Sequence, residues 1–331
     1  MDLDALAAAR AAAWDRLEQL GRARTLTGQE ADELITRYQA AASDLAAVHA
    51  AAGRSAVEAR LSVLVARARL RFAGTPANPF ESLPRLLLLH IPAALYRVRW
   101  LTLAVAGATA LIAFLYWLWG ASSPEFMAAL AQQADLEQVA KEDFVGYYSE
   151  YSGGAFTSLV WTNNAWIAAQ SIAFGITGVF VPYVIVMNAQ NLGVTAAIMH
   201  EYDRLDVFFA YISPHGLLEL YCIFVAGAAG LLIFWAWVVP GARTRGQALA
   251  QDGRALMTLA VALAIGLLVS GVIEGFVTRQ EWPWWIKTGI GAVALAGFLW
   301  VQWGLGRRAA RAGETGDLEA FEAGATRLVA G

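Results

Sequence analysis

The chain has 331 residues, of which 58% are hydrophobic and 15% are charged, and its net charge is −3. Soluble domains carry about 25% charged residues, so this composition excludes an ordinary soluble protein and predicts a polytopic membrane protein. The nearly balanced charge gives no reason to expect nucleic acid as a partner. The single cysteine, Cys222, excludes an intrachain disulfide.

Residues 1–75 predict a small soluble helical domain. Apolar residues recur at helical spacing in its first two helices, and the pairs Thr27 with Glu30 and Ser55 with Glu58 have the spacing of capping boxes. These pairs predict where the second and third helices begin. Residues 76–98 contain three prolines and a leucine patch flanked by basic residues, which is typical of a linker followed by an interfacial helix.

Apolar length predicts the membrane-spanning segments, because crossing the hydrocarbon core takes about 20 residues. Five segments meet this length: 100–119, 165–187, 216–239, 256–277 and 284–304. Residues 192–212 have the length of a sixth span but are polar in their centre. The sequence therefore predicts an all-α transmembrane bundle of about six crossings over residues 99–306, one of them broken, followed by a tail at 307–331.

Arginine placement favours six crossings over five. Six crossings place the basic segment 85–99 on the same side as six later arginines: Arg243, Arg245, Arg254, Arg307, Arg308 and Arg311. Since cytoplasmic loops are enriched in Lys and Arg, we expect both termini in the cytoplasm. A re-entrant pair of half-helices at 192–212 is the alternative.

The loop at 120–164 then lies outside the cytoplasm and is strongly acidic. It contains Lys141 against six carboxylates: Glu125, Asp135, Glu137, Glu142, Asp143 and Glu150. Phe126, Leu130, Ala134 and Val139 form part of an amphipathic helical stripe. We expect this helix to pack over the outer mouth of the bundle, or to present a face to an external partner.

Ionisable residues within apolar segments are the candidate site. Such groups persist in membranes where they pair, face a polar interior or perform a function. We expect an intramembrane polar cluster made of His200, Glu201, Asp203, Arg204, Asp206, His215, Glu219 and Glu274. Two interpretations stay open: a self-neutralising cluster that fixes packing, and a hydrated cavity or ion path.

Catalytic and cofactor signatures are weak. No motif for a nucleophilic serine, a P-loop or a dinucleotide site is present, so we assign no catalytic residue and expect no cofactor. A metal site would need His200, His215, Glu219 and Glu274 to converge, and His200-Glu201 lacks the second histidine of a zinc protease motif.

Four asparagines near the ends of the predicted spans are expected to cap helices or to hydrogen-bond across them: Asn163, Asn164, Asn188 and Asn191.

Together these residues resemble the stage II sporulation protein M family of integral membrane proteins. The matching elements are Tyr147-Tyr148-Ser149-Glu150, Trp161-Thr162-Asn163-Asn164, Asn188 with Gly193, Pro214-His215-Gly216 followed by Glu219, and Glu274. The resemblance covers roughly residues 95–310. It implies a polytopic membrane protein; founding members anchor cell-wall hydrolases during engulfment, and others sit beside genes for MoxR-type ATPases.

We therefore expect a multi-pass protein of the bacterial inner membrane, a homodimer that serves as a scaffold in cell-envelope remodelling. Its expected partners are the lipid bilayer, a second copy, and envelope proteins or a MoxR-type ATPase. The alternative from another class is a transporter or channel, whose polar path would be lined by the His, Glu and Asp residues above. An intramembrane hydrolase is a more distant alternative.

Overall fold

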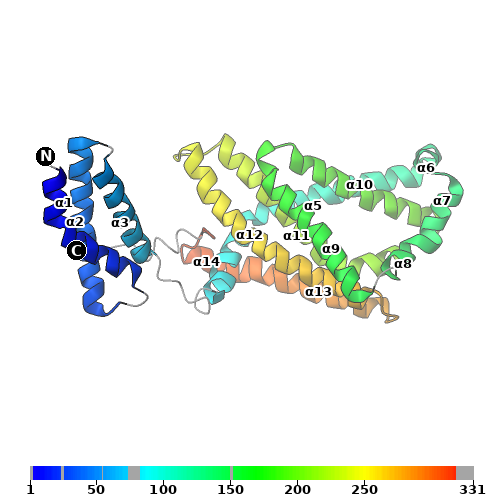
Figure 1. Cartoon of the computed structure of the whole chain (residues 1–331). Helices are drawn as coiled ribbons and strands as arrows, with labels where there is room; N and C mark the ends of the chain where they lie inside the picture. The colour runs from blue at the N-terminus through cyan, green and yellow to red at the C-terminus, as the bar shows by residue number, and fades with distance from the viewer. Residues whose placement is uncertain (1–2, 24–25, 54, 74–82, 150–151, 318–331) are drawn as a thin grey trace. The chain divides into compact units, whose positions relative to one another are not determined.

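The computed structural model describes residues 3–23, 26–53, 55–73, 83–149 and 152–317. These residues form helices joined by short turns, with no strand among them (Figure 1). They divide into two compact units, one before residue 83 and one from Leu83 onward. The all-α fold class is confirmed.

The N-terminal unit is a bundle of three helices: α1 (Leu3–Arg22), α2 (Gly28–Ala52) and α3 (Ala56–Ala73). Its core is made of apolar side chains from all three helices: Trp14, Leu17, Leu20, Leu34, Ala41, Val48, Leu61, Leu64 and Ala68. Thr27 and Glu30 form the capping box that the sequence predicts at the start of α2. At the start of α3, the amide of Glu58 donates to Ser55 Oγ over 3.1 Å.

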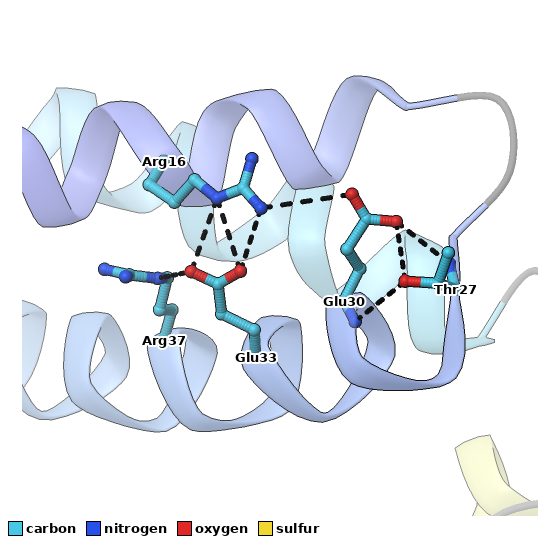
Figure 2. Close-up of polar contacts among 5 residues, drawn as sticks. All are labelled: Arg16, Thr27, Glu30, Glu33 and Arg37. Atoms are coloured by element: carbon cyan, nitrogen blue, oxygen red, sulfur yellow. Dashed lines mark hydrogen bonds and ion pairs between the residues drawn. The ribbon is translucent and has the colours of Figure 1, made fainter.

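A four-residue ion-pair network ties α1 to α2 on the surface of this unit (Figure 2). Glu33 of α2 accepts hydrogen bonds from Arg16 of α1, with Nη2 to Oε2 at 2.9 Å, and from Arg37 Nε at 2.7 Å. Arg16 also lies 3.9 Å from Glu30, the capping-box residue. These bonds lower the pKa of Glu33 to about 2, chiefly because Arg16 and then Arg37 stabilise the ionised carboxylate.

The second unit is a helical bundle. Its long helices are α5 (Ile91–Ser122), α9 (Gly153–Ala173), α10 (Phe180–Glu201), α11 (Leu205–Val238), α12 (Arg245–Ile273) and α13 (Trp284–Leu299). Shorter elements are η1 (Leu86–His90), η5 (Glu274–Thr278), η6 (Trp300–Leu305) and α14 (Gly306–Arg311). Within the described residues, five continuous helical segments are long and apolar enough to cross a membrane: 83–122, 180–201, 205–238, 245–278 and 284–311. The chain is therefore a multi-pass membrane protein.

Helix α11 forms the centre of this bundle (Figure 1). It packs against α5, α9, α12 and α13, and Cys222, Val225, Ala226 and Ala228 on it are fully buried. Small residues permit these close contacts. A Cβ on Gly291 of α13 would lie 2.0 Å from the carbonyl oxygen of Pro214 on α11, so only glycine fits there.

The helix boundaries correct two predicted spans. The predicted span 165–187 contains the turn between α9 and α10, where η4 (Gly175–Thr177) is followed by Gly178 at φ +74°. The predicted broken span 192–212 contains a second turn, where Asp203 adopts φ +55° between α10 and α11. The hydropathy of the sequence does not mark the α9–α10 turn, because the residues of that turn are as apolar as the helices on either side. The predicted boundaries of both spans are therefore wrong.

The α9–α10 turn has the chemistry of a segment in an apolar environment. No Asp, Glu, Lys or Arg occurs between residues 152 and 199, and Phe174, Ile176 and Val179 are exposed on the turn. Gly175 packs on Gly230, whose Cα lies 2.3 Å from where a Cβ on Gly175 would be, about two turns before the end of α11. Helices α9 and α10 therefore form a hairpin whose apolar turn packs against α11.

Two further boundaries differ from the prediction. The predicted interfacial helix is continuous with the first span from Leu83 to Ser122. The π-helical turn η1 lies within this segment just before Pro92, which has no N–H to donate. At the C-terminal side, residues up to 317 return to the bundle. Arg254 Nε donates to Asp317 over 2.7 Å, and Thr258 Oγ1 donates to the carbonyl of Gly316. The predicted linker at 76–82 and the tail beyond 317 lie outside the described residues.

Candidate functional site: a buried histidine and two glutamates

Three ionisable side chains meet in the bundle where α11 crosses the end of α12. His215 and Glu219 stand one turn apart on α11, and Glu274 begins the π-helical segment η5 that ends α12. One ligand-type atom from each of the three lies within 4.8 Å of the others. His215 and Glu274 are only 5% and 3% exposed, and Glu219 is partly buried.

The imidazole of His215 is held from both sides. Its Nδ1 lies 3.2 Å from Thr278 Oγ1, and its Nε2 lies 3.6 Å from Glu274 Oε1. Thr278 Oγ1 in turn donates to the carbonyl of Ile273 over 3.4 Å. The aromatic ring of Tyr148 covers the imidazole at a centroid distance of 5.9 Å.

The two carboxylates have different surroundings. Ser270 Oγ lies 3.3 Å from Glu219 Oε2 and 3.1 Å from the carbonyl of His215, and Asn164 of α9 also hydrogen-bonds to Glu219. Glu274 Oε2 is buried without a hydrogen-bond partner. Burying such an oxygen is costly unless something neutralises or binds it.

A buried lysine beside Thr278 is bound to the backbone. Lys287 of α13 is 5% exposed, and its Nζ donates to the carbonyl of Thr278 over 3.0 Å and lies 5.0 Å from the ring centre of Tyr211. Among the described residues, no Lys or Arg lies within ion-pair distance of Glu219 or Glu274.

Close backbone packing fixes the elements around the site. Thr157 Oγ1 of α9 donates to the carbonyl of Gly271 over 3.0 Å, and Trp161 Nε1 donates to the carbonyl of Ala264 over 3.0 Å. A Cβ on Gly275 would lie 2.2 Å from Thr157 Oγ1. Helix α9 therefore lies directly against the segment that carries Glu274.

The structure separates the predicted polar cluster into two groups. His215, Glu219 and Glu274 converge, whereas His200, Glu201, Asp203, Arg204 and Asp206 lie at the α10–α11 turn. In that turn all five are exposed except the partly buried Arg204. The helix ends at Glu201, so these residues form a polar turn at the end of the bundle and not the polar centre of a span. His200 is accordingly not part of the three-residue group.

The asparagines also differ in role. Asn164 reaches Glu219, as an interhelical contact requires. Asn163 is exposed in the middle of α9, so it is not a cap. Asn188 Nδ2 donates to the carbonyl of Val184 one turn earlier, and Asn191 accepts from Thr195, so both make contacts within α10.

Sequence reasoning missed Ser270 and Thr278. They stand four residues before and four residues after Glu274, so all three share one face of the same helical segment. This spacing was visible in the sequence and identifies the hydroxyl partners of the site. The family resemblance alone points to Tyr148, because no spacing or motif in the sequence connects this residue to His215.

The opposite end of the bundle holds a second group of charges. Asp252 is 2% exposed, and it accepts a hydrogen bond from Arg97 Nη2 and lies 3.3 Å from Arg243 Nη2. A cavity of about 580 Å³ opens beside them and also contacts Glu314 and Asp317. Basic residues therefore gather at this end.

A larger apolar cavity, of about 680 Å³, lies between α5, α10, α11 and α13. It is lined by side chains such as Phe114, Trp117, Phe209 and Phe224. Neither cavity has His215, Glu219 or Glu274 in its lining.

Comparisons with known proteins agree with this architecture. Residues 101–279 match the family described as stage II sporulation protein M, and residues 4–74 match a family described as a domain of unknown function (DUF8413). No curated protein and no solved structure matches the chain. The first match contains α9, α10, α11 and all three residues of the buried group. The chain belongs to the stage II sporulation protein M family.

Proposed function

We propose that this protein is a scaffold of the bacterial inner membrane that recruits partners in cell-envelope remodelling. The observation that carries the proposal is the division of the α6–α8 loop into a packed apolar side and an exposed acidic side. This loop comprises α6 (Pro124–Leu130), α7 (Gln133–Gln138), η2 (Val139–Asp143) and α8 (Phe144–Gly146).

The apolar side of the loop anchors it to the bundle. Met127, Leu136 and Ala140 are buried against α10 and α11, whereas Leu130 and Ala134 of the predicted stripe are exposed. The acidic side chains of Glu125, Asp135, Glu142 and Asp143 are exposed. A rigidly mounted acidic surface suits recognition of a basic partner surface, because complementary charge steers association and fixes its orientation.

The charge distribution along the bundle supports an orientation with both termini in the cytoplasm. Arg97, Arg243 and Arg254 lie at the end opposite the acidic loop, where α5 begins and α11 ends. Enrichment of arginine on one side is the usual mark of the cytoplasmic face. If α9 and α10 form a re-entrant hairpin, they begin and end on the same side, so this orientation does not depend on whether they cross.

The closed interior favours a scaffold over the alternative of a transporter. The buried glutamates would suit an ion path, yet neither of the two cavities described above has them in its lining, and α11 is packed through glycines and alanines. A homodimer remains part of the proposal, with the exposed apolar faces of the bundle as the contact. Envelope proteins or a MoxR-type ATPase are the proposed further partners.

The test is purification from native membranes in mild detergent, with quantitative mass spectrometry of co-eluting proteins. One variant neutralises the acidic surface (Glu125→Gln, Asp135→Asn, Glu142→Gln and Asp143→Asn), and a control removes two exposed charges at the other end (Arg307→Gln and Arg308→Gln). We expect a near-stoichiometric envelope partner with the wild type and the control and a loss of at least tenfold with the neutralised variant. Equal recovery with all three proteins would contradict the proposal.

A further inference from the structure

The group formed by His215, Glu219 and Glu274 has the donors of a metal site. One imidazole nitrogen and two carboxylates lie within 4.8 Å of one another, from two helices that are locked together. We propose that these three residues bind one divalent transition-metal cation, with zinc as the best match to a nitrogen and oxygen donor set. This inference goes beyond the proposed scaffold role and does not depend on it.

The hydrogen bonds of the imidazole direct its free nitrogen toward the carboxylates. When Thr278 Oγ1 donates to the carbonyl of Ile273, at 3.4 Å, it is left to accept from Nδ1 of His215. The Nδ1–H tautomer leaves a lone pair on Nε2, which faces Glu274 Oε1 at 3.6 Å. Two lone pairs at that distance repel unless a proton or a metal ion lies between them, and a metal ion would use both as ligands. Metal-binding histidines commonly donate the N–H of their other ring nitrogen to a hydrogen-bond acceptor, and Thr278 Oγ1 occupies that position here.

The unpaired oxygen of Glu274 is the second, independent observation. Glu274 is 3% exposed, and its Oε2 has no hydrogen-bond partner. A metal ion bound by the Glu274 carboxylate would coordinate this oxygen and so satisfy it.

Charge balance points to a divalent ion. Glu219 and Glu274 would together carry two negative charges in an apolar surrounding, where unpaired charge is costly. Lys287 is bound to the carbonyl of Thr278 and forms no ion pair with either carboxylate. A divalent cation neutralises both carboxylates at once.

Hydrogen bonds to Glu219 and His215 hold these side chains close to the positions that a metal ion would require. Ser270 and Asn164 hold Glu219, and Thr278 holds His215. Zinc ligands lie about 2.0–2.2 Å from the ion, so the three donors need to close by about an ångström, which rotation of the glutamate side chains allows.

The first test measures metal in the full-length protein purified without chelators. Elemental analysis should give about one zinc per chain after dialysis for the wild type and for Glu281→Gln, an exposed carboxylate near the same end of α12. Glu274→Gln and Glu219→Gln should each retain less than a tenth of that amount. Metal that remains in both variants, or an absence of metal from wild type loaded with excess zinc, would overturn the proposal.

A second test needs no variant and therefore does not depend on whether the variants fold. Wild-type protein is stripped with a chelator and titrated with Co²⁺, whose visible absorption reports low-coordinate nitrogen and oxygen ligation. We expect saturation at one equivalent and displacement of the bands by zinc. A featureless titration would overturn the proposal. Either test can fail while partner recruitment through the acidic loop stands, because that loop contributes no ligand.

Discussion

The Nε2 atom of His215 lies 3.6 Å from Oε1 of Glu274, and this contact joins the first third of α11 to the π-helical end of α12. π-helical turns inside longer helices occur frequently at functional sites. Here the turn places Glu274 and Thr278 on either side of the same imidazole. The orientation of His215 therefore depends on Thr278 as much as on the carboxylates.

Replacing Thr278 tests this dependence. Thr278→Val removes the hydroxyl but keeps the shape, which leaves the buried Nδ1–H of His215 without a partner and costs about 1–3 kcal/mol. Thr278→Ser keeps the hydroxyl and should have a much smaller effect. Thermal unfolding in detergent measures both. Equal melting temperatures for the two variants would show that the hydroxyl does not hold the imidazole.

The contact between α11 and α13 gives a second prediction. Gly291→Ala would place a methyl group 2.0 Å from the carbonyl oxygen of Pro214, so the helices must separate. Overpacking of this kind costs about 1–3 kcal/mol. Gly289→Ala on the same helix is the matched control, since nothing lies within 4 Å of its added carbon. Melting temperatures should fall for the first variant alone; unchanged stability in Gly291→Ala would mean that the helices pack less closely.

Much of the local structure could be predicted from the sequence, because short-range rules decide it. The capping box of Thr27 and Glu30 needs only three residues of spacing, and the shared face of His215 and Glu219 needs only one helical turn. The meeting of Glu274 with His215 depends on how α11 and α12 pack. No local pattern contains that information.

The α9–α10 turn shows why hydropathy misplaced the second and third spans. Phe174, Ile176 and Val179 make the turn as apolar as the helices on either side of it. A window average therefore runs straight through it, although Gly175, Gly178 and Pro182 mark the break. The sequence predicts that His200 to Asp206 lie in the centre of a span. Because α10 ends at Glu201, these residues lie instead at the turn between α10 and α11.

We expect the α9–α10 hairpin to turn back within the membrane, and cysteine labelling tests this expectation. In a Cys222→Ala background, Thr177→Cys at the tip of the turn should resist an impermeant thiol reagent applied from either side of the membrane. Asp203→Cys in the α10–α11 turn is the control, and it should react from the outer side alone. Rapid labelling of position 177 from the cytoplasm would instead show that α9 and α10 are full crossings.

The N-terminal unit should lose stability in acid. Arg16 and Arg37 lower the pKa of Glu33 from 4.5 to about 2 (Figure 2). The folded state therefore binds fewer protons than the unfolded state between these values. The stabilisation by the ionised carboxylate is present above pH 4.5 and is lost as the pH falls toward 2. Because the network is on the surface, added salt should weaken it.

Hydrogen exchange of peptides from residues 3–53 in the full-length protein measures this effect. Variants compared at the same pH have similar intrinsic exchange rates. A difference in their measured hydrogen exchange therefore reports a difference in how often α1 and α2 open. Glu33→Gln should raise exchange at neutral pH and flatten its change between pH 4.5 and 2, whereas the exposed neighbour variant Asp32→Asn should behave as wild type. A Glu33→Gln protein that keeps the full acid response would place that response in other carboxylates.

The recruitment of a partner by the acidic loop is the central claim, and photo-crosslinking in intact native cells tests it most directly. A photoreactive amino acid replaces Glu142 on the exposed acidic side, and a control replaces Met257, which is 59% exposed on the apolar surface of α12. The account predicts a discrete cross-linked envelope protein from position 142 that is absent from position 257 and absent when Glu125, Asp135 and Asp143 are neutralised. The same cross-linking pattern at both positions, with or without those charges, would contradict it.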